Sequence, residues 1–176
     1  MTEIKKIATR DAYGKALAEL AKENSNIFVM DADLSQSTKS VEFAKVCPER
    51  FVNAGIAEGN MIGVAAGLAA MGKTVFASSF AVFVTGRAFE QIRNSVCYPR
   101  LNVKVAGSHS GITVGEDGGT HQAIADISLM RSLPNMTVLV PADATATRWM
   151  VREAAAYDGP VYLRLGRLAA PVLYAD

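Results

Sequence analysis

Short runs of apolar residues alternate with longer segments of helical periodicity along the whole chain. The runs lie at residues 27–30, 51–53, 74–77, 103–106, 137–140 and 161–165, and the helical segments lie at 9–23, 40–45, 58–71, 83–96, 123–132 and 141–156. This alternation is typical of parallel βαβ units, in which crossover helices bury both faces of the sheet. We therefore expect an α/β fold of the three-layer, doubly wound type, with a mostly parallel sheet and helices on both faces.

The length of 176 residues fits one compact domain, and 50% of the residues are hydrophobic, which is enough for a sizeable core. We expect residues 1–176 to form a single domain. Residues 169–176 show no further element and look like a severed connection, left either by removal of another domain or by the end of the gene. The net charge is +1 and the basic residues are scattered, so we expect no nucleic-acid partner.

Targeting signals and cysteine motifs are both missing from the sequence. The first residues lack the apolar stretch of a signal peptide, and no run is long enough to cross a bilayer. We therefore expect a cytoplasmic protein without a membrane partner. Cys47 and Cys97 stand far apart, without CxxC or Cys/His spacing. They are expected to be buried thiols.

A carboxylate at the start of a glycine-punctuated helix is the first candidate for chemistry. Glu58 follows Ala54-Gly55-Ile56-Ala57 and opens the segment 58–71, which contains Gly63 and Gly67. An acidic residue in a first turn stabilises the helix dipole, and glycines permit close packing. In an apolar surround, however, the pKa of such a carboxyl would rise, and the group could share a proton with a ring nitrogen. The residues alone leave both interpretations open.

Both histidines of the chain fall in one glycine-rich stretch. His109 stands in Ser108-His109-Ser110-Gly111, and His121 stands in Gly115-Glu116-Asp117-Gly118-Gly119-Thr120-His121-Gln122. A lone surface histidine is usually uninformative, but two of them beside the carboxylate of Asp117 suggest positioned donors or proton carriers. Their spacing matches no standard metal-ligand pattern, so we expect no metal site in this chain.

Two aromatic residues and a polar loop follow strand ends. Phe80 and Phe83, three residues apart, could stack on a planar heterocycle or simply pack in the core. Asp33 and Ser37 lie just past the strand at 27–30, where open α/β sheets place their ligand crevices. We expect a site loop there.

Arginines flank the domain in the sequence. Arg10 and Arg167 each lie close to the end of an element, so they could meet in space. Guanidinium forks suit phosphate oxygens, although a single exposed arginine is more often merely solvated.

Taken together and in this order, these segments resemble the pyrimidine-binding (Pyr) domain of transketolase, as in the C-terminal chain of split transketolases. The similarity runs through Ala8-Thr9-Arg10, Asp31-Ala32-Asp33-Leu34, Gly55-Ile56-Ala57-Glu58, Ser79-Phe80, 115–122 and Arg164-Leu165-Gly166-Arg167. It implies the thiamine-diphosphate-binding fold of Pyr type. It also implies a transferase that moves a two-carbon ketol unit from a ketose phosphate to an aldose phosphate, as in the pentose phosphate pathway.

The resemblance further implies a role for each matching residue. Glu58 would hydrogen-bond a ring nitrogen of the cofactor's aminopyrimidine, with Phe80 and Phe83 against that ring. His109 and His121 would be catalytic residues that face the substrate. Asp117 would lie near a substrate hydroxyl, Arg10, Ser37 and Arg167 would bind the sugar phosphate, and Asp33 would stand at a subunit contact close to the cofactor.

Two departures from the family pattern are visible. A third aromatic residue that is common on the pyrimidine side falls at Gly86 here. The Gly-Asp-Gly segment that binds the magnesium diphosphate, followed by an Asn, is missing, and Asp117-Gly118-Gly119 does not replace it. We therefore expect this chain to lack the diphosphate-binding domain, and we expect it to lack the C-terminal domain as well. The resemblance implies that a partner, the diphosphate-binding (N-terminal) transketolase chain, binds the magnesium ion. The assembly would be a homodimer of Pyr domains or a heterotetramer. The isolated chain would be inactive.

Other functions remain open on the residues alone. A related Pyr domain occurs in deoxyxylulose-phosphate synthase and in the β chain of 2-oxoacid dehydrogenases, and the Glu58 segment would serve either. Transketolase is preferred because His109, Asp117 and His121 together suit a polyhydroxylated sugar phosphate. A non-catalytic structural subunit and a free-standing flavodoxin-like binding module are the alternatives from other classes.

Overall fold

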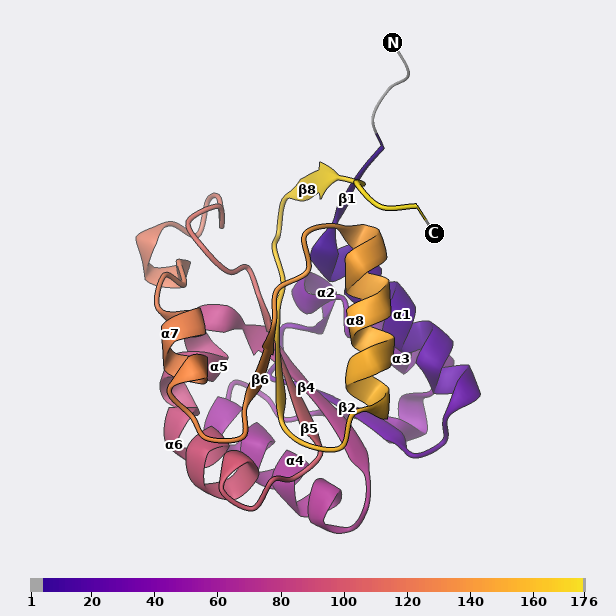
Figure 1. Cartoon of the computed structure of the whole chain (residues 1–176), viewed down its shortest axis with the longest axis vertical. Coiled ribbons are helices and arrows are strands. Elements are labelled where there is room, and N and C mark those ends of the chain that lie inside the picture. The colour runs from indigo at the N-terminus through magenta and orange to yellow at the C-terminus, as the bar shows by residue number, and fades with distance from the viewer. Residues whose placement is uncertain (1–4, 176) are drawn as a thin grey trace.

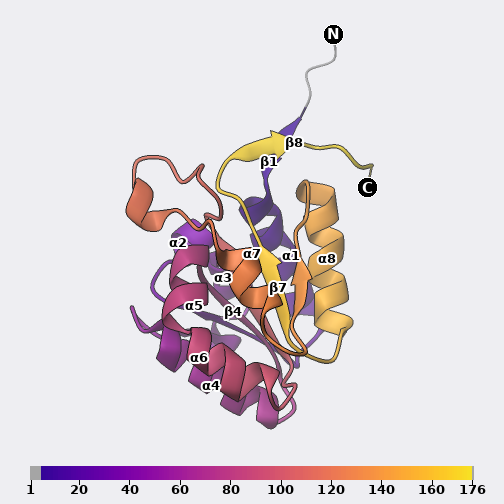
Figure 2. The same ribbon diagram turned by 60° about the vertical axis from the view of Figure 1, so that its left-hand side comes forward.

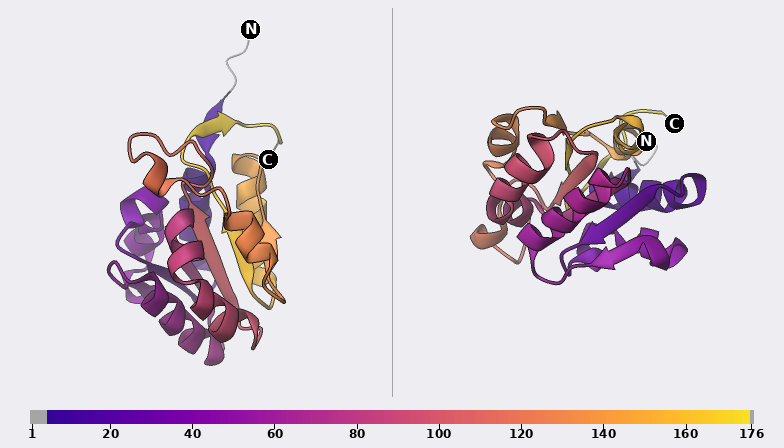
Figure 3. Two further views of the ribbon diagram at one scale, coloured as in Figure 1. Left: turned by 90° about the vertical axis from the view of Figure 1, so that its left-hand side faces the viewer. Right: turned by 90° about the horizontal axis from the view of Figure 1, so that it is seen from below.

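A computed structural model describes residues 5–175 of the chain. A six-stranded sheet forms the middle layer, and helices cover both of its faces (Figures 1 and 3). Its strands are β2 (Ile27–Asp31), β3 (Phe51–Asn53), β4 (Thr74–Phe80), β5 (Val103–Ser108), β6 (Thr137–Leu139) and β7 (Val161–Arg164). All pair in parallel, in the order β3-β2-β4-β5-β7-β6. The expected three-layer α/β fold is confirmed.

The helices divide into two groups, one on each face of the sheet. One group consists of α1 (Thr9–Glu23), α3 (Val41–Val46) and α8 (Ala144–Ala156). The other consists of α4 (Glu58–Ala70), α5 (Ala81–Arg87), α6 (Phe89–Gln91), the π-helical η2 (Ile92–Cys97) and α7 (Asp126–Arg131). The short α2 (Ser35–Thr38), η1 (Pro48–Arg50) and η3 (Gly119–His121) lie in connections. Within residues 5–175, no helix has the length and apolarity needed to span a membrane.

Each face of the sheet has its own apolar core. Tyr13 and Leu17 of α1 pack with Phe43 of α3 over one face, and the side chains from α4 and α5 fill the other. The central strand β4 is buried over its whole length because it has strands on both sides and helices over both faces. The prediction that Cys47 and Cys97 are buried thiols is confirmed.

The strand order creates a crevice at the carboxyl edge of the sheet. Strand β3 pairs with one edge of β2, and β4 then pairs with the other edge. The direction in which successive strands are added to the sheet therefore reverses between β2 and β4. Connections that leave in opposite directions open a crevice at this point, which is where doubly wound proteins bind ligands. The segment with η3 rises at the same end of the molecule as β1 (Lys6–Ala8) and β8 (Ala169–Pro171) (Figure 2).

The prediction that residues 169–176 contain no further element was wrong. Strand β8 pairs antiparallel with β1, with Ile7 opposite Ala170. Each strand has three residues, and Ala-Ala-Pro has a weak intrinsic preference for strands. Because the pairing joins the two ends of the domain, the local pattern carried no sign of it.

Several expected boundaries also needed correction. Strand β4 continues to Phe80, so Ser78 and Ser79 belong to the buried strand and not to a loop after it. The helix expected at 83–96 begins earlier and is divided into α5, α6 and the π-helical η2. The helix expected at 123–132 shrinks to α7, because Ala123 makes an antiparallel bridge with Gly111 and stays extended.

Candidate functional site

A cavity of about 470 Å³ opens at the carboxyl ends of the strands. Its wall combines residues from the start of α1, the loop after β2, the end of β4, the long connection after β5 and the segment after β7. The wall residues are Arg10, Leu34, Gln36, Ser37, Lys39, Phe80, His109, Glu116, Asp117, His121 and Arg167. All six residues predicted to contact substrate therefore line one cavity, together with Phe80.

The ends of α1 and β7 are tied together, which explains how Arg10 and Arg167 meet. The backbone N–H of Gly166 donates to Thr9 Oγ1 at 2.7 Å, and the N–H of Arg10 donates to the carbonyl of Gly166 at 3.4 Å. These bonds bring the two guanidinium groups to the same rim. The predicted proximity of the two arginines is confirmed.

His109 is held as a neutral imidazole by its neighbours. Arg10 Nη1 lies 3.1 Å from His109 Nε2, and because a guanidinium only donates, Nε2 must accept. The ring proton then resides on Nδ1, which donates to Ser108 Oγ at 3.0 Å. Burial, with the charges of Arg10 and Arg167, lowers the pKa of His109 to about 4. At neutral pH this side chain is uncharged.

This arrangement predicts the titration of His109. Its nitrogens should show the Nδ1–H tautomer from pH 8 down to pH 5, and the ring should take up a proton only near pH 4. The unfolded state binds that proton near pH 6.5, so the chain should lose stability as the pH falls from about 6.5 to about 4. Nitrogen-15 NMR of the two histidines measures this directly, and His121→Gln assigns the signals. A His109 midpoint near 6.5 would contradict the geometry.

A buried carboxylate fixes the loop after β2. Asp31 accepts hydrogen bonds from the hydroxyls of Thr38 at 2.7 Å and Ser40 at 2.8 Å, and from the N–H of Leu34 at 2.6 Å. The loop in turn presents the carbonyl of Ser37, which accepts from Arg10 Nη1 at 2.9 Å. Asp31 therefore positions this wall of the cavity without lining it.

Glu58 lies at the first position of α4 and is almost fully buried, with 3% of its surface exposed. The surround of this carboxylate is not wholly apolar, because Arg87 Nη1 lies 3.2 Å from its Oε1 and 3.4 Å from its Oε2. The same guanidinium lies over the ring of Phe83, 4.3 Å from its centroid. The first-turn position agrees with the helix-dipole interpretation, whereas the burial and the aromatic neighbour favour a binding role.

The aromatic side chains form a continuous group that Arg87 links to this carboxylate. Phe80 and Phe83 are stacked with centroids 5.8 Å apart, and His109 stacks on Phe80 at 3.9 Å. His121 meets the edge of Phe83 at 5.2 Å. The two phenylalanines therefore connect the Glu58 region to the two histidines in the cavity.

Asp33 and Gly86 lie apart from this group. Asp33 is exposed, has a φ of 65°, exchanges hydrogen bonds with Asn53 and is outside the cavity wall. Its predicted role at a subunit contact remains a prediction. Gly86 has open space around its Cα, so nothing replaces a side chain at that position. The next residue, Arg87, covers Phe83 instead.

Sequence reasoning missed five residues of this region. Leu34, Gln36, Lys39 and Glu116 line the cavity, and Arg87 pairs with Glu58. Glu116 and Lys39 lie within two residues of predicted site residues, and this proximity in sequence is the only feature that could have predicted them. Arg87 stands four residues after Phe83 on a helix, a spacing that brings side chains together.

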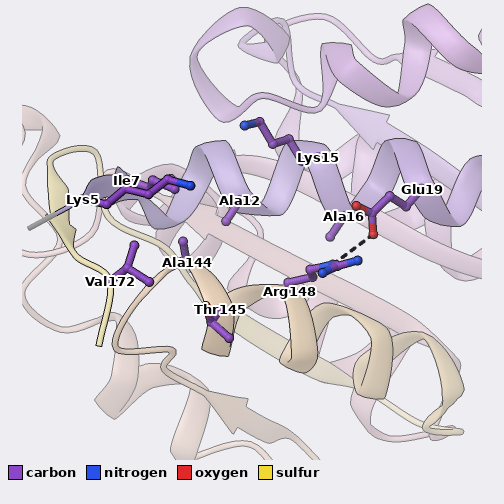
Figure 4. A pocket seen from close by; sticks show the side chains of 10 residues that line it. All are labelled: Lys5, Ile7, Ala12, Lys15, Ala16, Glu19, Ala144, Thr145, Arg148 and Val172. Atoms are coloured by element: carbon purple, nitrogen blue, oxygen red, sulfur yellow. Dashed lines mark hydrogen bonds and ion pairs between the residues drawn. The ribbon is translucent and has the colours of Figure 1, made fainter. Parts of the chain in front are cut away.

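Two other features bear on ligand sites. A second cavity of about 240 Å³ lies between α1 and α8, and an ion pair of 3.2 Å between Glu19 and Arg148 joins the two helices at one end of it (Figure 4). None of the predicted site residues lines this second cavity. Among residues 5–175, no group of three or more His, Cys, Asp or Glu side chains is arranged to hold a metal ion.

The family follows from comparison with known proteins. Residues 5–172 match the family model described as "Transketolase, pyrimidine binding domain". The chain belongs to this family. The Pyr domain is 56% identical to the putative transketolase C-terminal section of Methanocaldococcus jannaschii over 167 residues, which are 95% of this chain and 53% of the relative. It is 46% identical to the 6-deoxy-6-sulfo-D-fructose transketolase subunit SqwH of Clostridium sp. strain MSTE9, over 92% of this chain and 50% of the relative.

A solved structure supports the same assignment. The Pyr domain is similar to a split gene transketolase, an inactive beta4 tetramer, with a TM-score of 0.86 and 61% identity over 96% of this chain and 54% of that one. The Pyr domain thus spans about half the length of these relatives.

Proposed function

We propose that this Pyr domain is one part of a thiamine-diphosphate-dependent transketolase, which transfers a two-carbon ketol unit from a ketose phosphate to an aldose phosphate. The observation that carries the proposal is the cavity at the strand ends. Two histidines, two carboxylates and two arginines line it, and Phe80 in its wall stacks against Phe83, whose ring is covered by the guanidinium that pairs with the buried Glu58. A polyhydroxylated anion needs this combination of hydrogen-bonding and cationic groups.

The residues around Glu58 fit an aminopyrimidine ring. Glu58 offers a buried carboxylate that can exchange a proton with a ring nitrogen, and Phe80 and Phe83 offer flat surfaces. The hydroxyl of Ser79, one residue before Phe80, is buried without a hydrogen-bond partner among the described residues. When bound, thiamine diphosphate would serve as the electron sink of the reaction.

Each group of cavity residues would then contact a different part of the substrate. Arg10 and Arg167, with Ser37, would bind the anionic end of the sugar, because guanidinium groups bond phosphate oxygens in pairs. His109 is neutral and can donate or accept without adding charge, whereas Asp117 is positioned to accept from a hydroxyl. His121, against Phe83, would complete the set near the reacting carbon.

A second chain is part of the proposal. The diphosphate of the cofactor and its magnesium ion would be held by an N-terminal transketolase chain, in a heterotetramer or around a homodimer of Pyr domains. The proposal is supported by relatives named as transketolase sections or subunits. A place in the cytoplasm and in the pentose phosphate pathway belongs to the same proposal.

A 2-oxoacid dehydrogenase and a purely structural subunit are less well supported, whereas deoxyxylulose-phosphate synthase is separated from transketolase by its use of pyruvate. A short 2-oxoacid has no hydroxyl groups for His109, Asp117 and His121, and a structural subunit needs no such cavity.

An assay of the reconstituted assembly tests the proposed function. This chain and an N-terminal transketolase chain would be mixed with thiamine diphosphate and magnesium, and supplied with a ketose phosphate plus an aldose phosphate, with 6-deoxy-6-sulfo-D-fructose plus an aldose phosphate, or with pyruvate. Ketol transfer from a sugar substrate by the mixture, with neither chain active alone, is the expected result. Turnover of pyruvate without ketol transfer would overturn the proposal.

A further inference from the structure

Arg87 engages two of the groups that are assigned above to the pyrimidine ring. Its guanidinium lies over the face of Phe83, with Cζ 4.3 Å from the ring centroid. Its Nη1 simultaneously lies 3.2 Å and 3.4 Å from the two oxygens of Glu58. One flat, nitrogen-bearing group thus covers the aromatic surface and bonds the buried carboxylate.

These contacts are those that an aminopyrimidine would need. A ring that stacks on Phe83 and bonds Glu58 through a nitrogen would occupy the space of the guanidinium. We propose that Arg87 occupies the pyrimidine site of the cofactor-free chain and must swing away when thiamine diphosphate binds. The inference rests on the proposed function and adds a residue that opposes cofactor binding.

The extent of the open cavity agrees with this assignment. Phe80 forms part of the cavity wall, but the wall includes neither Phe83 nor Glu58. The side chain of Glu58 is 3% exposed, whereas that of Arg87 is 54% exposed. Arg87 therefore lies on the solvent side of Glu58, and an exposed side chain on a helix surface can move without disturbing the core.

The chemistry of Glu58 explains why such a residue is useful. An ionised carboxylate buried beside aromatic rings is costly unless it is paired. Arg87 supplies a partner until the cofactor arrives, and the ring nitrogen then replaces it. Removing Arg87 destabilises the cofactor-free state more than the bound state, so cofactor affinity should rise.

The experiment measures cofactor affinity and not activity. Isothermal titration calorimetry of the two-chain assembly with thiamine diphosphate, in excess magnesium, gives the dissociation constant. Arg87→Leu should bind roughly fivefold to thirtyfold more tightly than wild type, because exposed cation–π contacts and ion pairs are each modest. The control Arg93→Leu removes an exposed arginine of the same helical region and should leave the constant unchanged.

A second variant covers the case in which Arg87→Leu fails to fold. Arg87→Lys keeps a cation beside Glu58 but loses the flat guanidinium, and it should bind the cofactor more tightly than wild type, though less tightly than Arg87→Leu. Equal or weaker binding by the folded Arg87 variants overturns the inference while leaving the proposed function intact. No binding by wild type or any variant overturns both.

Discussion

Replacing Glu58 with glutamine should lower the turnover number of the reconstituted assembly by about a thousandfold, within the range of 10² to 10⁴ that is typical of positioned proton-transfer groups. Glutamine keeps the size of the side chain and can still accept a hydrogen bond from Arg87, so the start of α4 should remain intact. It cannot exchange a proton with a ring nitrogen. The loss should therefore appear in turnover, measured with saturating sugar phosphates, and only weakly in the melting temperature.

The matched control is Glu153→Gln, an exposed position on α8, on the opposite face of the sheet. This variant should retain wild-type turnover. A loss of less than about fivefold in Glu58→Gln would favour the structural-subunit hypothesis, because a subunit that only stabilises its partner does not need a proton at this position.

Removing both cavity arginines should produce the second large effect. In the double variant Arg10→Ala and Arg167→Ala, kcat/KM for a phosphorylated ketose should fall by roughly a thousandfold, since each charge-assisted hydrogen bond contributes about 1.5–3 kcal/mol. The loss should be smaller for a ketose without phosphate, because the proposed contacts of both arginines with the substrate are to its anionic end, and only the contact of Arg10 with His109 would affect both sugars. Steady-state kinetics with both sugars measures the ratio.

Two further variants separate binding from positioning. Arg167→Ala alone should affect phosphate recognition, whereas Arg10→Ala also frees His109 Nε2 and the carbonyl of Ser37. Arg131→Ala, at an exposed position on α7, serves as the control for loss of charge and should behave as wild type. Equal losses for phosphorylated and unphosphorylated sugars in the double variant would contradict a phosphate-binding role.

The sequence pattern predicted the layers and most of the cavity wall for a physical reason. Buried parallel strands require continuous apolar runs, and the polar residues that follow them meet at one edge of the sheet. Ser37 and His109 each follow such a run, so their approach at this edge was predictable from the pattern of strands. The ordered combination of the Glu58 segment with residues 115–122 then indicated the transketolase family.

Features that depend on tertiary contact could not be predicted. The pairing of β1 with β8 joins the two ends of the domain, as Ile7 opposite Ala170 illustrates, and neither segment has a strong strand preference. The pairing of Arg87 with Glu58 spans two helices, and the positive φ of Lys39, 70°, follows from the end of the short helix α2. Their geometry is set by packing and not by local pattern.

A crystal structure of the two-chain assembly with thiamine diphosphate and magnesium tests the central claim most directly. The aminopyrimidine should lie against Phe83 with a ring nitrogen within hydrogen-bonding distance, about 3 Å, of the Glu58 carboxylate, while the diphosphate lies on the partner chain. The Arg87 side chain should have left the face of Phe83. A pyrimidine ring bound elsewhere, with Glu58 still paired to Arg87, would contradict the assignment of this carboxylate to the cofactor.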